Sequence, residues 1–132
     1  MLGDSKVHAI VPTHDLATAR RFYEDKLGAK VAQEMRDGGG LVLACGEGSE
    51  FLLYQTQVKI PAEHTTMFFR VANVDDAVAD LESRGVTFEV YDLESMGFEG
   101  MGSGKIIRTD EIATAFFKDP EGNIISVTEM LS

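Results

Sequence analysis

The stretch VHAIVPTHDLATARRFYEDKLGAKV, residues 7–31, predicts a strand, a helix and the start of a second strand. Residues 7–12 are rich in strand-forming side chains. Asp15 is expected to cap the helix, and Gly28 to end it in a left-handed turn. Apolar residues recur between them at helical spacing, at Leu16, Ala19, Phe22, Tyr23 and Leu27.

Three further strands are expected at 30–35, 41–46 and 50–55, because the turn signals RDGGG and GEGS separate them. The first part of the chain is therefore a β-α-β-β-β unit.

The same order is expected to begin again after a linker at 58–64 that contains Pro61. A strand at 65–71 precedes a helix at 73–85 with Ala77, Val78 and Leu81 facing inward, and the last three strands are expected at 86–93, 112–119 and 123–130. Pairs of like residues share a 60-residue offset: Val11 and Val71, Asp15 and Asp75, Ala17 and Ala77, and Ala19 and Ala79. These pairs favour a duplicated module. We predict a single domain over 1–132, with module one at about 6–57 and module two at about 65–130.

Composition narrows the possible partners. The chain has 132 residues, enough for one ordinary core, and a formal charge of -10, with 12 basic against 22 acidic residues. Such a balance disfavours nucleic acid and anionic lipid. No apolar run is long enough to span a bilayer and no signal segment opens the sequence, so we expect a cytoplasmic protein. The single Cys45 has apolar flanks and is interpreted as a structural thiol.

Two motifs carry a family resemblance: D-x-x-x-A-x-x-F-Y-x-x-x-L-G at 15–28, and D-P-E-G-N at 119–123. Over about residues 6 to 130 the chain resembles the vicinal oxygen chelate superfamily, which includes glyoxalases, extradiol dioxygenases and the fosfomycin and bleomycin resistance proteins. The resemblance implies an α+β fold of two tandem βαβββ modules that form a curled mixed sheet around a cavity. It also implies helices on the outer face, and commonly dimerisation.

Strand alternation predicts which side chains line that cavity, because amphipathic helices cover only one face of a sheet. In the first strand, Val7, Ala9 and Val11 are expected to pack under the helices, which directs His8 and Ile10 into the hollow. In the last strand, Ile125 and Val127 suit the helix side. The inward residues expected over the whole chain are His8, Ile10, Leu52, Tyr54, Thr66, Phe68, Arg70, Ser126 and Thr128.

Metal-dependent members of the family hold a divalent ion with His and Glu side chains from several strands. Matched one position at a time, His8 agrees with the first-strand ligand, whereas the other ligand positions fall on Leu52, Thr66 and Ser126. One side chain cannot hold the ion, so we predict no metal and no other cofactor. The alternative is a divalent metal at His8, with His64 brought in by a longer strand or Glu129 turned inward by a bulge.

The remaining cavity suits a small, largely planar, aromatic organic ligand. Arg70 would offer a positive charge to a carboxylate or phenolate, or else lie on the rim in a surface ion pair. Tyr54 and Phe68 are alternatively core aromatics, and His8 a histidine that is hydrogen-bonded inside the fold.

The segment ESMGFEGMGSGK, residues 94–105, combines five glycines with Met96, Phe98 and Met101. We interpret these three side chains as part of a lid over the ligand. The alternatives are a disordered connection or a dimer contact.

The favoured function is a metal-free binding protein of the bleomycin-resistance type, a homodimer that sequesters or carries a small aromatic compound. The alternative is an enzyme. It would be a metal-dependent lyase or dioxygenase, or a metal-free isomerase or hydrolase with His8 as the base.

Overall fold

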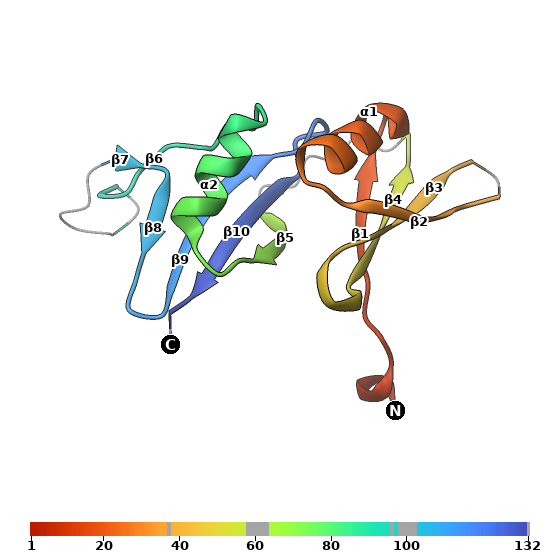
Figure 1. Cartoon of the computed structure of the whole chain (residues 1–132), viewed down its shortest axis with the longest axis horizontal. Coiled ribbons are helices and arrows are strands. Elements are labelled where there is room, and N and C mark those ends of the chain that lie inside the picture. The colour runs from red at the N-terminus through yellow and green to blue at the C-terminus, as the bar shows by residue number, and fades with distance from the viewer. Residues whose placement is uncertain (37, 58–63, 96, 98–102, 132) are drawn as a thin grey trace. The chain divides into compact units, whose positions relative to one another are not determined.

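The computed structural model describes residues 1–36, 38–57, 64–95, 97 and 103–131. The chain forms two compact units, Met1–Pro61 and Ala62–Ser132, and each has its own four-stranded mixed sheet (Figure 1). The predicted α+β class and the duplicated βαβββ module are confirmed. The curl of both modules around one cavity stays a prediction, and most of the predicted linker, residues 58–63, lies outside the described residues.

The first unit follows the predicted order of elements. Its sheet has the order β1, β4, β3, β2, in which β1 and β4 are parallel and the other neighbours are antiparallel. The elements are the 3-10 helix η1 (Leu2–Asp4), β1 (Ala9–Thr13), α1 (Leu16–Arg21), the π-helix η2 (Phe22–Lys26), β2 (Lys30–Glu34), β3 (Gly40–Ala44), the 3-10 helix η3 (Gly46–Gly48) and β4 (Glu50–Gln55).

The helix of the first unit begins and ends where the sequence predicts. The Asp15 carboxylate accepts a hydrogen bond of 3.1 Å from the Thr18 amide, and Gly28 has a φ of 75°. The helix continues from α1 into η2, and the Tyr23 side chain is fully buried there, with its ring centroid 5.2 Å from that of Phe51 on β4. This aromatic pair fixes the helix to one face of the sheet.

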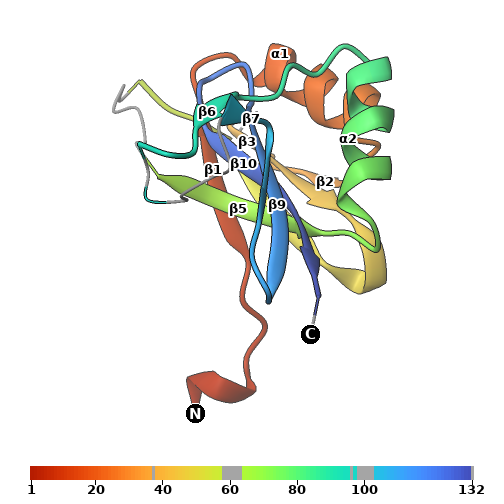
Figure 2. The ribbon, with the colours of Figure 1, turned by 90° about the vertical axis from the view of Figure 1, so that its left-hand side faces the viewer.

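The second unit repeats the topology, with the sheet order β5, β10, β9, β8 and a separate pair of β6 with β7. Helix α2 packs against β9 and β10 (Figure 2). The elements are β5 (Thr65–Arg70), α2 (Val74–Ser83), β6 (Tyr91–Asp92), β7 (Ser103–Gly104), β8 (Ile106–Arg108), β9 (Ile112–Lys118) and β10 (Ile124–Met130).

The strand predicted at 86–93 is wrong. In that stretch Phe88 forms an isolated bridge to Phe117, and the Glu89 amide donates to the Phe116 carbonyl over 2.8 Å. Strand β6 covers only two residues, and β8 is the fourth strand of the sheet. A tight turn joins β8 to β9, in which the Thr109 amide donates to the Ile112 carbonyl over 2.9 Å. So short a hairpin loses little entropy on closure, which favours β8 over the more distant segment.

Two details of the sequence pattern are not reproduced. The offset pairs Asp15 with Asp75, but their roles differ, since Asp15 is the N-cap of α1 and Asn73 is the N-cap of α2. Asp75 lies in the first turn of α2 and forms an ion pair of 2.6 Å with Arg108. Val7 is 90% exposed, not packed under the helices, since β1 begins only at Ala9.

The D-P-E-G-N motif builds the turn between β9 and β10. The buried Asp119 carboxylate accepts hydrogen bonds from the amides of Glu121 and Asn123, and from the Asn123 side chain over 2.8 Å. Gly122 has a φ of 94°, a conformation that favours glycine. The motif therefore fixes the hairpin that carries Ser126 and Thr128.

Within the described residues, no helix is both long and apolar enough to cross a membrane.

Candidate ligand-binding hollow

One row of side chains crosses the open face of the first sheet. Ile10 on β1 lies opposite Leu52 on β4, Leu52 lies opposite Val42 on β3, and Val42 lies opposite Gln33 on β2. The alternate residues of β3 and β4 face the helix and are buried: Leu41, Leu43, Phe51 and Leu53. Ile10, by contrast, is 58% exposed, so this face of the sheet is accessible.

This face contains a hollow of about 500 Å³. It is lined by His8, Ile10, Ala32, Gln33, Met35, Val42, Glu50, Phe51 and Leu52. A second depression, of about 400 Å³, shares Met35 and Leu52 with it and is otherwise lined by Arg36, Gly39, Gly40 and Tyr54. The two depressions follow β4 from Glu50 toward Tyr54.

Four residues expected in the cavity lie along these depressions, namely His8, Ile10 and Leu52 in the first and Tyr54 in the second. Six lining residues of the first hollow were not predicted: Ala32 and Gln33 on β2, Met35 directly after β2, Val42 on β3, and Glu50 and Phe51 on β4. Alternation from Leu52 would have indicated Glu50 and, across the pairing, Val42. Ala32 could not be found in this way, because a register shift between Val31 and Gln33 interrupts the alternation of β2.

The other expected residues share one face of the second sheet, opposite α2. Phe68 lies beside Ser126, and Arg70 lies beside Thr128. Phe68 is 58% exposed, and Arg70 is exposed and forms no ion pair within the described part of the chain. Thr66 lies at the irregularity in the pairing of β5 with β10, and its buried hydroxyl has no hydrogen-bond partner among the described residues.

A cluster of hydroxyl groups occupies the centre of that face. Thr114 and Thr128 are hydrogen-bonded through their hydroxyl oxygens over 2.9 Å, and Thr114 donates to the Val127 carbonyl over 3.2 Å. The Ser126 hydroxyl lies 3.3 Å from that of Thr128. All three side chains are buried, so these polar groups bind one another.

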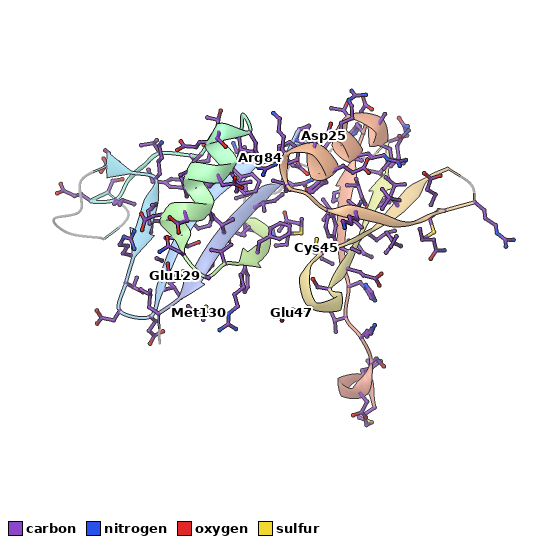
Figure 3. The ribbon with its side chains drawn as sticks, in the orientation of Figure 1. Asp25, Cys45, Glu47, Arg84, Glu129 and Met130 are labelled. Carbon is purple, nitrogen blue, oxygen red and sulfur yellow. The ribbon has the colours of Figure 1, made fainter. Side chains whose placement is uncertain are left out.

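The two substitute metal ligands do not join these residues. Glu129 projects toward the helix side of β10, where its carboxylate accepts a hydrogen bond of 2.9 Å from the Val74 amide at the start of α2; Figure 3 marks its position. His64 is exposed and precedes β5. Glu129 therefore binds the first amide of α2, beside the N-cap Asn73, and it points in the direction that strand parity predicts for it.

The residues matched to the family's metal ligands do not fit a divalent ion. Leu52 offers no donor atom, the hydroxyls of Thr66 and Ser126 are neutral, and only His8 is a strong ligand. In the described ranges, no three His, Cys, Asp or Glu side chains come together as a metal site would require.

The Cys45 thiol is not among the groups that line the hollow. Burial raises the pKa of the partly buried Cys45 thiol, which lowers its reactivity and agrees with a structural role. The three side chains interpreted as a lid, Met96, Phe98 and Met101, lie outside the described residues.

Two βαβββ units, each with a helix on one sheet face, define a protein with the glyoxalase fold. A family comparison agrees with this class, since the model of the Glyoxalase/Bleomycin resistance protein/Dioxygenase superfamily matches residues 6–127. The chain belongs to this superfamily, which confirms the resemblance seen in the sequence.

Individual relatives are distant. The virulence protein STM3117 of Salmonella typhimurium strain LT2 is 21% identical, over 98% of this chain and 86% of that protein. Two solved structures share the fold. TnmS3, an antibiotic binding protein from Streptomyces sp. CB03234, has a TM-score of 0.71 and 22% identity, covering 96% of this chain and 98% of that one. The fosfomycin resistance protein FosX from Listeria monocytogenes has a TM-score of 0.70 and 11% identity, covering 96% and 93%.

Proposed function

We propose that this chain is a small-molecule-binding protein of the superfamily, which sequesters or carries a small aromatic compound without a metal ion. The observation that carries the proposal is the hollow of about 500 Å³ on the open face of the first sheet. Its volume is within the range of ligand pockets, roughly 300–1,000 Å³. Its aliphatic walls, from Ile10, Val42 and Leu52, suit the face of a planar ring, and a few polar side chains at its border would orient the ligand.

The composition of the matched ligand positions supports a metal-free site. One histidine among two hydroxyls and a leucine does not provide the several converging donors that a divalent ion needs. The likeness to an antibiotic binding protein supports a resistance-type role only by analogy of fold.

Thermal-shift and calorimetric titrations with planar aromatic compounds test the proposal, starting with naphthylmethanol and with a chelator present throughout. We expect saturable binding of one molecule per chain, and recovery of the compound unchanged by mass spectrometry. Ala32→Phe should reduce the affinity because Ala32 lines the hollow, whereas Ala79→Phe on the exposed side of α2 should leave it intact. Binding that appears only with Zn, Ni, Mn or Fe(II) and disappears on chelation would contradict the metal-free proposal.

A second candidate function is metal-free catalysis, because His8 on the wall of the hollow could act as a general base. Turnover that survives chelation and is lost in His8→Ala would identify this function.

We further propose that the two units work as one domain and that the chain forms a cytoplasmic homodimer. Large apolar side chains exposed on the strands support self-association, namely Ile10 and Phe68, each 58% exposed. Light scattering after size exclusion measures the mass. A monomer at micromolar concentration would remove the dimer from the proposal.

A further inference from the structure

The hollow has one acidic side chain, and this suggests the class of its ligand. We propose that the hollow binds compounds that combine an apolar aromatic body with a positively charged amine, and that Glu50 binds the amine. This inference rests on the proposed binding function and adds the charge of the ligand to it.

Glu50 is well placed for this role. It is the first residue of β4 and shares the open face with Leu52 and Tyr54, because side chains alternate along a strand. The residue is partly buried, and it lines the hollow together with His8 and Gln33. A carboxylate at the edge of an apolar surface is less hydrated than one in open water, so a cation that arrives there is bound more strongly.

The charge of the hollow is also one-sided. Among the described residues that line it, Glu50 is the only acid, and none is Lys or Arg. The whole chain carries a formal charge of -10, which adds a general attraction for cations.

The Glu50 carboxylate is available to a ligand. It forms no ion pair and accepts no side-chain hydrogen bond from any other residue that the structure describes. Two other acids of this unit are engaged, since Glu24 and Glu34 each contact Arg20 at 2.8 Å. Glu50 differs from these two in having no such cation, and from the exposed Glu47 in lining the hollow.

One basic residue lines the second depression and gives the ligand a direction. This residue is Arg36, which lies there together with Tyr54. Tyr54 is four residues along β4 from Glu50, about 13 Å at the usual rise of a strand. We therefore expect the amine of the ligand to lie beside Glu50 and His8, with its aromatic body over Leu52 and Val42. The end of the ligand that lies near Arg36 should carry no second positive charge.

Three probes of one shape test the inference: naphthylmethylamine, naphthylmethanol and naphthoic acid, which present a cation, a neutral hydroxyl and an anion on the same ring system. Isothermal titration of the full chain at low salt should give an affinity about tenfold higher for the amine than for the alcohol, as expected for one charge-assisted hydrogen bond. The acid should bind more weakly than both.

Substitutions separate the role of Glu50 from that of the general charge. Glu50→Gln keeps the shape and should make the amine and the alcohol bind equally, while Glu50→Lys should make naphthoic acid the preferred probe. Glu47→Gln is the matched control, because Glu47 is an exposed acid of the same unit in the turn after β3 (Figure 3) and does not line the hollow. It should retain the preference for the amine.

The outcomes distinguish this inference from the proposal on which it rests. Equal binding of all three probes, unchanged in Glu50→Gln, would overturn the role of Glu50 and leave the binding function standing. A preference for the amine that persists in Glu50→Gln would also overturn it, by assigning the effect to net charge. Failure of every probe to bind would count against the binding function itself.

Discussion

The two sheets of this protein have the same topology and different polar chemistry on the faces opposite their helices. In the first unit, an apolar row is bordered by His8, Gln33 and Glu50, and Glu50 has no partner among the described residues. In the second unit, the corresponding face holds Ser126 and Thr128 in a buried cluster of hydroxyls that bond to one another. Alternation fixes the direction of a side chain, whereas its neighbours decide whether its polar atoms remain available for a ligand.

The largest loss of stability is expected when a buried aromatic side chain is removed from the core of either unit. Tyr23 in the first unit and Phe117 in the second are each fully buried. Replacing either with Ala should lower the free energy of unfolding by about 3–5 kcal/mol, through lost burial and a residual cavity. Urea denaturation followed by circular dichroism measures the loss. Phe68→Ala, at an exposed position of β5, is the control and should lower it by less than about 1 kcal/mol.

The hydroxyl cluster is tested by Thr114→Val. This change removes the donor to the Val127 carbonyl and one of the two hydroxyl contacts of Thr128, so the free energy of unfolding should fall by about 1–3 kcal/mol. Val42→Thr places a hydroxyl on the accessible face of the first sheet, where water can bind it, and should change stability by less than about 1 kcal/mol. Equal losses in the two variants would show that the two faces do not differ in this way.

The role of Glu129 is tested at the start of α2. Glu129→Ala removes the acceptor of the Val74 amide and should lower the free energy of unfolding by about 1 kcal/mol. Glu129→Gln keeps an oxygen at the same place and should lose less. If Glu129 were instead needed for ligand binding, both variants would lose affinity for naphthylmethylamine while keeping wild-type stability.

The smallest expected effect is the difference between the two helix caps in how they contribute to stability as the pH is lowered. The Thr18 amide holds the pKa of the Asp15 carboxyl below its ordinary value of 3.8, whereas Asn73, the cap of α2, does not titrate. A carboxyl with a lowered pKa stabilises the fold fully above its ordinary pKa, and this contribution is lost as the pH falls through the folded value. Stability curves between neutral pH and pH 3 should therefore be flatter at the acid end in Asp15→Asn and steeper in Asn73→Asp. Unchanged slopes would contradict the assignment.

Much of the fold could be predicted because local signals agreed with the tertiary structure. The first helix begins at its cap, Asp15, and ends at Gly28 as expected. In the D-P-E-G-N turn, the Asn123 side chain donates a hydrogen bond to the Asp119 carboxylate. The strand expected at 86–93 failed because β propensity does not decide which segment pairs with a sheet edge. The close hairpin of β8 with β9 decided that instead.

The candidate site was predictable only in part. Strand parity placed Ile10 and Leu52 on the open face. Side chains alternate between the two faces of a strand with a period of two residues, so this prediction needs no knowledge of the partner strand. Gln33 and Val42 required the pairing of β2, β3 and β4, and Ala32 required the register shift in β2. None of these pairings is visible in the chain read in order.

The sequence by itself determined the family, the two repeated units and the residue types at the positions matched to the family's metal ligands, since each depends on residue types at fixed spacing. Only the tertiary structure decided which polar groups are satisfied. Glu129 binds the amide of Val74, 55 residues away, and Thr114 binds Thr128 across a hairpin, while Glu50 lies on the wall of a hollow without such a partner in the described chain. Hydrogen bonds and burial depend on neighbours in space, and the fold brings those neighbours together from distant parts of the chain.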